Sequence, residues 1–291
     1  MKRIHSAGGS GNVPSVVIPA HNEAAVIERT LRGVLAGGVP DLEIVVVVNA
    51  CTDRTAEIAR GIDDSIRVIE TDTPGKTNAL NLGEAGITSF PRMFLDGDIE
   101  LRPDAVRHLF DALDDEKTIV SPRPGFDLSG LSFAMRLFYR AQRFNAYFGD
   151  GAPNGSGCFV VGEHGRARWA DFPEIIADDG YVQGHFRPSE RFTVNASEAI
   201  VKPPKTIDAM ITVRSRVRRG KYELERRFPE LMKNHVARGG GIFKQMIVRP
   251  WEWPAMLVYG YVRIAERLIA KRQIASGETG WGRDETGRVT E

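Results

Sequence analysis

Short β-branched runs alternate with amphipathic segments along the first half of the chain. The runs at 14–20, 42–50 and 66–70 carry few charges, as expected of strands that are covered on both faces. The segments that follow them place apolar residues at helical spacing and end at glycines, among them Gly61. This alternation predicts an α/β fold of Rossmann-like type, in which helices flank a mostly parallel central sheet.

Polar residues mark the expected starts of the helices. Asn22 is the predicted N-cap of the first helix, and Thr52 or Asp53 that of the second. A fourth strand is predicted over 92–98, and Pro103 suits the start of the helix after it.

The pattern changes after about residue 122. An aromatic-rich helix is predicted over 128–149 and a glycine-flanked strand over 154–162. Two further strands are predicted over 191–195 and 198–204, and a basic helix over 206–228. A C-terminal helical extension completes the expected fold.

Composition places the chain among ordinary soluble globular proteins. Its 291 residues are 42% hydrophobic and 26% charged, and two cysteines give no disulfide framework, which favours a reducing compartment. The leader over 1–13 lacks an apolar core of signal-peptide length. The sequence contains no uninterrupted run of about 18 apolar residues, so we predict no membrane span.

The net charge of +1 hides an asymmetry between the two ends of the chain. Residues 1–200 carry a net charge of −8, and residues 201–291 carry +9. A cationic C-terminal third indicates an anionic partner, either phosphate groups or an acidic membrane face. The alternative is a solvated basic helix surface.

Two acids stand one residue apart at the end of the fourth apolar run. Gly97 lets the backbone turn, so that Asp96 and Asp98 can face one cleft, where a divalent cation, basic side chains or water must separate their charges. Oxygen ligands of this kind suit Mg²⁺ or Mn²⁺, although such a triplet also occurs as a solvated turn. Ligands of open parallel sheets bind beyond the carboxyl ends of the strands, so we expect the polar loops there to converge.

Four segments in order carry a family resemblance. They are VVIPAHNEAAVIERTL, VVVVNACTDRTAEIA, GKTNALNLG and MFLDGDIEL. Together they resemble the nucleotide-sugar half of the inverting glycosyltransferases of family 2, which have the GT-A fold. The resemblance covers about 14–220. It implies a nucleotide-sugar-binding half over 14–122 and an acceptor-binding half over 123–220. Beyond these, the sequence itself predicts a helical extension over 221–275 and a disordered tail over 276–291.

The resemblance implies a donor site in the first half. The loop from Ala20 to Glu23 lines the nucleotide base, and Lys76 lies near the donor phosphates; a P-loop is excluded because Glu70 stands where its first glycine is required. Asn49 stands where the family usually has an aspartate that reads a uracil edge; this departure weakens the case for uracil, although an amide can still pair with a pyrimidine. A UDP-sugar is the favoured donor by the resemblance. The implied donor-binding residues are Pro19, Ala20, Asn22, Glu23, Asn49, Lys76, Asp96, Gly97, Arg216 and Arg219.

The resemblance also implies a metal and a general base. Asp98, with Asp96, binds the Mg²⁺ or Mn²⁺ that holds the diphosphate, and His185 is either a further ligand or a polar surface histidine. Asp179 is the expected base on the acceptor hydroxyl. Asp178 beside it raises its proton affinity, although the two acids could instead form a helix N-cap pair.

The C-terminal segment over 247–272 combines aromatic, aliphatic and basic residues. This composition suits a helix on an anionic bilayer, a dimer interface or a helix packed on its own domain. Membrane-surface association with a lipid-linked acceptor is favoured by analogy, which places the protein in the cytoplasm or on the inner face of the cell membrane.

The predicted function is a metal-dependent inverting glycosyltransferase. It moves a single sugar from a nucleoside-diphosphate donor to an acceptor hydroxyl, and no nucleic-acid partner is expected. Alternatives are a retaining transferase of the same fold, a nucleotidyltransferase, and an inactive sugar-nucleotide-binding scaffold.

Overall fold

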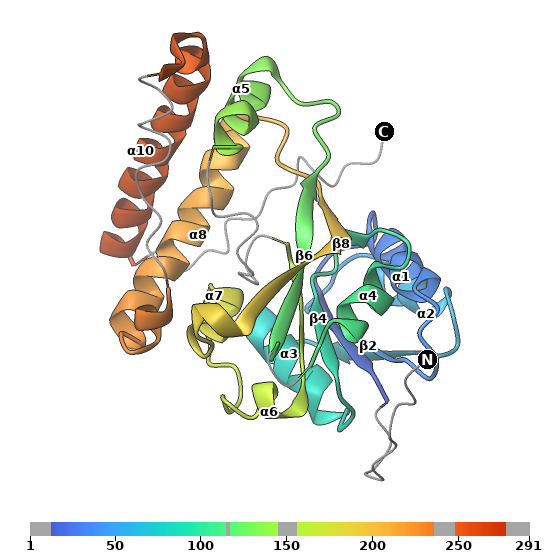
Figure 1. The fold of residues 1–291 in the computed structure, drawn as a ribbon. Helices are drawn as coiled ribbons and strands as arrows, with labels where there is room; N and C mark the ends of the chain where they lie inside the picture. The colour runs from blue at the N-terminus through green and yellow to red at the C-terminus, as the bar shows by residue number, and fades with distance from the viewer. Residues whose placement is uncertain (1–12, 115–116, 145–155, 236–247, 278–291) are drawn as a thin grey trace.

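A mixed sheet of eight strands runs through the protein, and helices lie on both of its faces (Figure 1). The structure, a computed structural model, describes residues 13–114, 117–144, 156–235 and 248–277. The predicted leader over 1–13 and tail over 276–291 lie almost entirely outside the described residues.

The strands and helices have the following bounds. The strands are β1 (Ser15–Ala20), β2 (Glu43–Asn49), β3 (Ile66–Thr71), β4 (Arg92–Leu95), β5 (Glu100–Leu101), β6 (Ile119–Phe126), β7 (Cys158–Val161) and β8 (Arg191–Val201). The α-helices are α1 (Ile27–Ala36), α2 (Thr55–Arg60), α3 (Lys76–Ala85), α4 (Ala105–Asp111), α5 (Phe133–Gln142), α6 (Glu163–Arg166), α7 (Asp178–Gly184), α8 (Ile207–Arg227) and α10 (Trp253–Ala275). Short 3₁₀ turns are η1 (Pro188–Glu190), η2 (Leu231–Asn234) and η3 (Pro250–Glu252).

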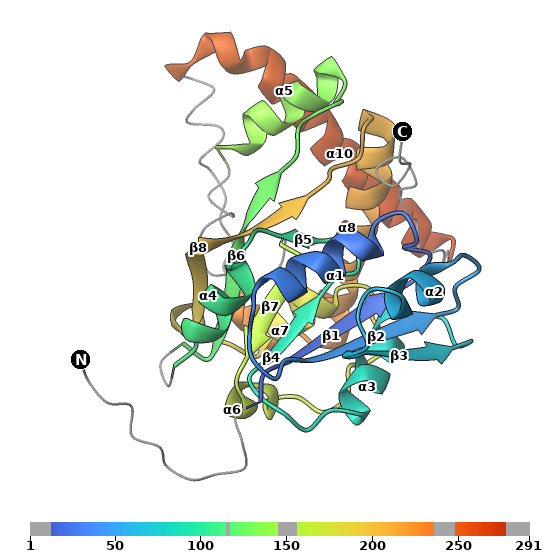
Figure 2. The same cartoon turned by 90° about the vertical axis from the view of Figure 1, so that its right-hand side faces the viewer.

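The order of strands across the sheet is β3-β2-β1-β4-β7-β6-β8-β5. The first four positions are parallel, as are β6 and β8, while β7 runs antiparallel between β4 and β6 and β5 runs antiparallel to β8. The predicted α/β class with a mostly parallel sheet is therefore confirmed. The carboxyl ends of β1, β2 and β4 share one edge of the sheet, which positions the loops that follow them (Figure 2).

Alternate residues of the central strands feed two different cores, because successive side chains of a strand point to opposite faces. Val16 and Ile18 of β1 pack with α1, α2 and α4 on one face. Val17 of β1, with Val45 and Val47 of β2, packs with α3 and α7 on the other face. Both faces of the strands are thus apolar, which explains why their sequences read as uninterrupted hydrophobic runs.

Two local predictions at the loops need correction. Helix α1 begins at Ile27 rather than directly after Asn22, and its N-cap position makes no side-chain hydrogen bond. Asn22 instead adopts a left-handed backbone with φ of 50°, and its Oδ1 accepts a hydrogen bond from the Thr52 backbone at 2.8 Å. The N-cap position of α2 is Arg54 rather than Thr52 or Asp53, although Asp53 Oδ1 accepts a hydrogen bond from the Thr55 backbone N–H at 3.0 Å.

The second half of the chain differs in one strand. The two segments predicted over 191–195 and 198–204 form a single strand, β8, whose pairing with β6 shifts register between Pro122 and Arg123. The aromatic helix predicted over 128–149 is α5, which begins later, at Phe133 after the N-cap Ser132, and ends at Gln142; residues 145–149 of the predicted span lie outside the described residues.

A third core lies away from the sheet, where α5, α8 and α10 pack together (Figure 1). Phe138 of α5, Met210 of α8, and Met256 and Tyr259 of α10 meet there, and the Phe138 and Tyr259 rings stack with centroids 5.4 Å apart. The predicted C-terminal helical extension is thereby confirmed. Among the described residues, no helix combines the length and apolar character needed to cross a bilayer.

Two glycines, one in α3 and one in α10, provide a matched test of how closely α3 packs on the sheet. In α3, a Cβ on Gly83 would lie 2.5 Å from Val17 Cγ1 and 3.2 Å from Val47 Cγ2, whereas a Cβ on Gly260 in α10 meets nothing within 4 Å. We expect Gly83→Ala to lower the free energy of unfolding by about 1–3 kcal/mol through overpacking. Gly260→Ala should raise it by up to about 1 kcal/mol through helix propensity. Urea unfolding of both variants measures the difference, and equal effects would contradict the close approach of α3 to the sheet.

Candidate active site

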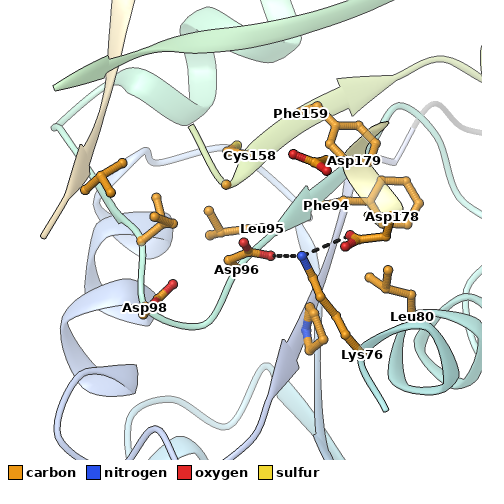
Figure 3. Close-up of a pocket in the computed structure, with 14 residues that line it drawn as sticks. Lys76, Leu80, Phe94, Leu95, Asp96, Asp98, Cys158, Phe159, Asp178 and Asp179 are labelled. Carbon is orange, nitrogen blue, oxygen red and sulfur yellow. Dashed lines mark ion pairs between the residues drawn. The ribbon is translucent and has the colours of Figure 1, made fainter. Parts of the chain in front are cut away.

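The carboxyl ends of β1 and β4 open onto a pocket with a cavity volume of about 220 Å³ (Figure 3). Its charged lining consists of Lys76, Asp96, Asp98, Asp178 and Asp179. Apolar side chains form other walls, including the rings of Phe94 and Phe159, which stack with centroids 4.9 Å apart. The pocket therefore combines four acids and one cation with an apolar wall.

The turn after β4 is held in place by backbone contacts. The Asp96 N–H donates to the Gly157 carbonyl at 2.8 Å, and the Thr30 hydroxyl donates to the Gly97 carbonyl at 3.0 Å. Gly97 lies so close to the end of β1 that an added Cβ would be 3.2 Å from the Pro19 carbonyl oxygen. This approach is tighter than an ordinary Cβ contact, so a side chain here would need the turn and the end of β1 to separate by a few tenths of an ångström.

Lys76 links two of the acids from different parts of the chain. It is the first residue of α3, and its Nζ lies 2.7 Å from Asp96 Oδ1 and 2.9 Å from Asp178 Oδ2. In Figure 3, Asp98 and Asp179 lie on opposite sides of this bridge. A single ammonium thus neutralises part of the charge that four neighbouring carboxylates bring together.

The charges in this pocket shift one another's pKa values. Burial opposes the charge on Lys76, but the carboxylates of Asp178 and Asp96 raise its pKa above the ordinary value. Burial also raises the pKa of Asp96, with neighbouring carboxylates acting in the same direction and Lys76 opposing them. For Asp179, burial and then the charge of Asp178 raise the pKa to about 6, against the opposing effect of Lys76. Such a carboxylate can take up a proton near neutral pH.

The acidic pair lies in the first turn of α7. Asp178 is buried and Asp179 is half-buried, and both line the pocket. The residue at the N-cap position is Ala177, and the Oδ1 of Asp179 accepts only locally, from the Gly180 N–H at 2.6 Å. The pair is therefore directed at the pocket and is not the N-cap of the helix.

A hydrogen-bond network joins the loops after β1 and β2. The Glu23 N–H donates to the Thr55 hydroxyl at 2.8 Å, and the Ala24 N–H donates to Asp53 Oδ2 at 3.0 Å. The His21 ring lies 2.7 Å from the Asn49 carbonyl oxygen. These contacts hold the predicted nucleotide-binding loop against β2 beside the pocket.

Asn49 has a positioning role in the structure. It is 4% exposed, its Nδ2 donates to the Ala20 carbonyl at 2.8 Å, and its Oδ1 accepts from the Gly75 N–H at 3.2 Å. Both ends of the amide are thus engaged with backbone of two other loops. The structure shows Asn49 tying together the loops that carry Ala20 and Lys76, where the sequence predicted a contact with a pyrimidine.

Eight of the predicted site residues do not line the pocket. They are Ala20, Asn22, Glu23, Asn49, Gly97, His185, Arg216 and Arg219. The His185 ring packs against Trp169 and Tyr181, with centroids 5.8 and 4.8 Å apart, and burial lowers its pKa. Arg216 and Arg219 lie on α8, where Arg219 is buried next to Gly220, whose Cα faces Ala177. The structure therefore brings together Pro19, Lys76, Asp96, Asp98, Asp178 and Asp179 from the predicted set.

Several lining residues were not predicted as site residues. Cys158 and Phe159 come from β7, and Val201 from the end of β8. Burial and the charge of Asp96 raise the pKa of the Cys158 thiol, so it remains protonated and serves as a small wall residue. The antiparallel pairing of β7 with β4, which includes Leu95 with Cys158, brings β7 to the site, and no local sequence pattern predicts that pairing.

Comparison with known sequences identifies the family. A family model described as glycosyl transferase family 2 matches residues 15–164, which include Lys76, Asp96 and Asp98. The chain belongs to this family. Family membership rests on the strands and loops from β1 to β7.

Two curated relatives illustrate the range of the family. Validoxylamine A glucosyltransferase of Streptomyces hygroscopicus subsp. jinggangensis is 34% identical over 114 residues, 36% of this chain and 27% of that protein. The 4,4'-diaponeurosporenoate glycosyltransferase of Staphylococcus aureus is 26% identical over 190 residues, 62% of this chain and 48% of that protein. The chain spans about half or less of the length of these relatives.

Two solved structures share the fold. The mannosyltransferase PcManGT from Pyrobaculum calidifontis, in complex with GDP-Man and Mn²⁺, aligns over 92% of this chain and 75% of its own, with a TM-score of 0.58 and 18% identity. Glucosyl-3-phosphoglycerate synthase from Mycobacterium tuberculosis, in complex with UDP, aligns over 81% and 88%, with a TM-score of 0.52 and 18% identity. These likenesses confirm the predicted GT-A architecture.

The positioning role of Asn49 can be tested by one conservative substitution. Asn49→Asp removes the donor to Ala20 and places a carboxylate against its carbonyl oxygen, so we expect the free energy of unfolding to fall by about 1–3 kcal/mol. The introduced acid should have a raised pKa, so the loss is present above that pKa and diminishes as the pH falls and the carboxyl regains a donor. Urea unfolding at neutral and acid pH measures both effects.

Asn78→Asp is the matched control. Asn78 lies on α3 and donates to the Thr73 carbonyl at 3.2 Å in an exposed position, where a carboxylate keeps its water. An Asn49→Asp variant no less stable than this control would contradict the assigned role.

Proposed function

We propose that the protein is a metal-dependent inverting glycosyltransferase, which moves one sugar from a nucleoside diphosphate to an acceptor hydroxyl. The observation that carries the proposal is the placement of Asp179, with a pKa of about 6, in the same pocket as Asp96, Asp98 and Lys76. One group is suited to accept a proton, and the others are suited to a charged diphosphate and its counter-ion.

The reaction follows from these positions. Asp179 takes the proton of the acceptor hydroxyl while the oxygen attacks C1 of the sugar from the face opposite the nucleotide. The new C1–O bond forms as the bond to the diphosphate breaks, so the anomeric centre inverts and the diphosphate leaves with the electron pair. Lys76 is paired with Asp96 in this structure. When Asp96 takes part in binding the donor, the ammonium of Lys76 is therefore beside the leaving phosphates and can interact with them.

A divalent cation fits the donor set of the pocket. Asp96 and Asp98 offer hard oxygen ligands, and four acids face only one cation in the described lining. Within the described residues, no three His, Cys, Asp or Glu side chains are grouped as a complete metal site. Asp96 and Asp98 would therefore hold Mg²⁺ or Mn²⁺ together with diphosphate oxygens and water. When bound, the cation would neutralise charge on the leaving group.

The donor and acceptor follow by analogy. The two solved neighbours carry GDP-Man with Mn²⁺ and UDP, and the curated relatives are named a glucosyltransferase and a glycosyltransferase. We favour a UDP-hexose, although the engaged Asn49 does not itself support uracil recognition. The acceptor would present its hydroxyl against the apolar wall formed by Phe94 and Phe159, which is compatible with a lipid-linked acceptor.

The general base is tested by Asp179→Asn. We expect kcat to fall by about 100- to 10,000-fold while the dissociation constant of the donor stays near the native value, because Asp179 acts on the acceptor. The native rate should rise as the pH passes through about 6, since the ionised form is the base, and this limb should be absent from the variant. Donor hydrolysis and transfer assays across pH, with calorimetric donor binding, measure these quantities.

Asp171→Asn is the matched control, because Asp171 is an exposed acid seven residues before Asp178. It should leave the rate and its pH profile unchanged.

Native protein that binds nucleotide sugars without turnover would instead indicate the scaffold alternative, and a product with the donor's anomeric configuration would overturn inversion.

The position of the cation is tested by Lys76→Met. The ammonium of Lys76 now neutralises Asp96 and Asp178, so its removal should tighten Mn²⁺ binding without nucleotide by about tenfold. Titration of Mn²⁺ by calorimetry or electron paramagnetic resonance measures the change. Lys117→Met, which removes an exposed lysine paired with Asp114, is the control. Equal or weaker Mn²⁺ binding by Lys76→Met would place the metal away from Asp96.

A further inference from the structure

The outer face of α10 carries an exposed apolar stripe. Leu257, Tyr261, Ile264 and Leu268 recur at helical spacing and are each between 59% and 70% exposed. At a rise of about 1.5 Å per residue, the stripe is about 16 Å long. Large side chains in a contiguous exposed row indicate an interaction surface.

The opposite face of the same helix is buried in the protein's own core. Met256, Tyr259 and Val262 are buried against α5 and α8, so α10 cannot turn its stripe inward without losing this core. Figure 1 shows α10 as the outermost element of this layer, on the side of α8 that is away from the sheet. The stripe is therefore a stable feature of the surface.

The charges of α10 are divided between its two faces. Glu266, the only acidic residue in the helix sequence, is 1% exposed and forms ion pairs with Arg214, Arg218 and Arg263. The exposed charged residues on α10 are all basic, namely Arg267, Lys271 and Arg272. Lys271 lies one turn beyond Leu268, and Arg267 directly precedes it, so cations border the apolar row.

We propose that the outer face of α10 docks on an anionic lipid surface, with the stripe buried among the acyl chains near the headgroups and the basic residues on lipid phosphates. An apolar row bordered only by cations is the arrangement of helices that lie in a membrane interface. Exposed tryptophans at the start of the layer, Trp251 and Trp253, suit the same interface. This docking is independent of the reaction proposed above.

A second copy of the chain is a less suitable occupant. In a two-fold dimer the same patch faces itself, so Arg267, Lys271 and Arg272 of each copy would meet only apolar and basic side chains of the other α10, and the two positive patches would repel each other. With Glu266 buried and paired, α10 supplies no exposed carboxylate to offset that repulsion. Lipid phosphates supply the missing negative charge.

The test is co-sedimentation of the full chain with vesicles of phosphatidylcholine, with and without phosphatidylglycerol. We expect binding to the vesicles that contain phosphatidylglycerol, weakened by high salt. Leu257→Ser/Leu268→Ser should lower the partition coefficient by about tenfold or more. Arg267→Gln/Lys271→Gln should lower it by a similar factor, because each cation near an anionic surface contributes about fivefold.

Matched controls remove the same groups elsewhere. Leu128→Ser removes an exposed leucine outside α10, and Arg54→Gln/Lys117→Gln removes the same charge from the N-cap of α2 and from the segment just before β6. Both should bind like the native protein, and circular dichroism verifies that all variants are folded.

Three outcomes would overturn the proposal. They are no binding to vesicles with phosphatidylglycerol, equal binding to both kinds of vesicle, and binding that the α10 variants leave unchanged. A concentration-dependent dimer in analytical ultracentrifugation that Leu257→Ser/Leu268→Ser abolishes, without vesicle binding, would assign the face to a second copy instead.

Discussion

The ammonium of Lys76 between Asp96 and Asp178 is the interaction on which the site depends. Each of the three residues comes from a different part of the chain. Without a cation between them, the carboxylates of Asp96 and Asp178 would repel each other in a partly buried pocket. The bridge therefore ties the start of α7, through Lys76, to the turn after β4. Since one positive charge cannot neutralise four acids, the same pocket retains the negative potential that attracts a cation.

The convergence of the loops could be predicted from sequence for a physical reason. Parallel strands end at a common edge, so the segments after β1, β2 and β4 had to meet once the alternation of strands and helices was recognised. Asp96 was predicted at the site on this basis together with the family resemblance, whereas Lys76 was predicted from the resemblance. Asp179 depended on the resemblance alone, because its distance along the chain gives no local indication of contact with Asp96.

Several residues make contacts that the sequence did not indicate, because these contacts depend on tertiary structure. Asn22 looked like a helix cap, but its amide is taken by the β2 loop, so α1 begins four residues later than the expected first turn. The pairing of Asn49 with two backbone groups is likewise decided by loops far away in sequence. His185 lies just past the end of α7, where the chain turns its ring into an aromatic cluster. The antiparallel insertion of β7 could not be read from any local pattern.

The number of basic residues in the sequence overstates the positive charge that the surface offers to a partner. The C-terminal third is strongly basic, yet Arg214, Arg218 and Arg263 surround the buried Glu266 and are part of the packing of α10 on α8. Glu252 is similarly buried and paired with Arg140 and Arg143 of the α5 region. Each buried carboxylate pairs with several basic side chains, because its negative charge must be compensated away from water. Those basic side chains stabilise the packing of the helix and are not available to a partner. The sequence thus indicates that a basic region exists, whereas the pairing decides which cations remain for a partner.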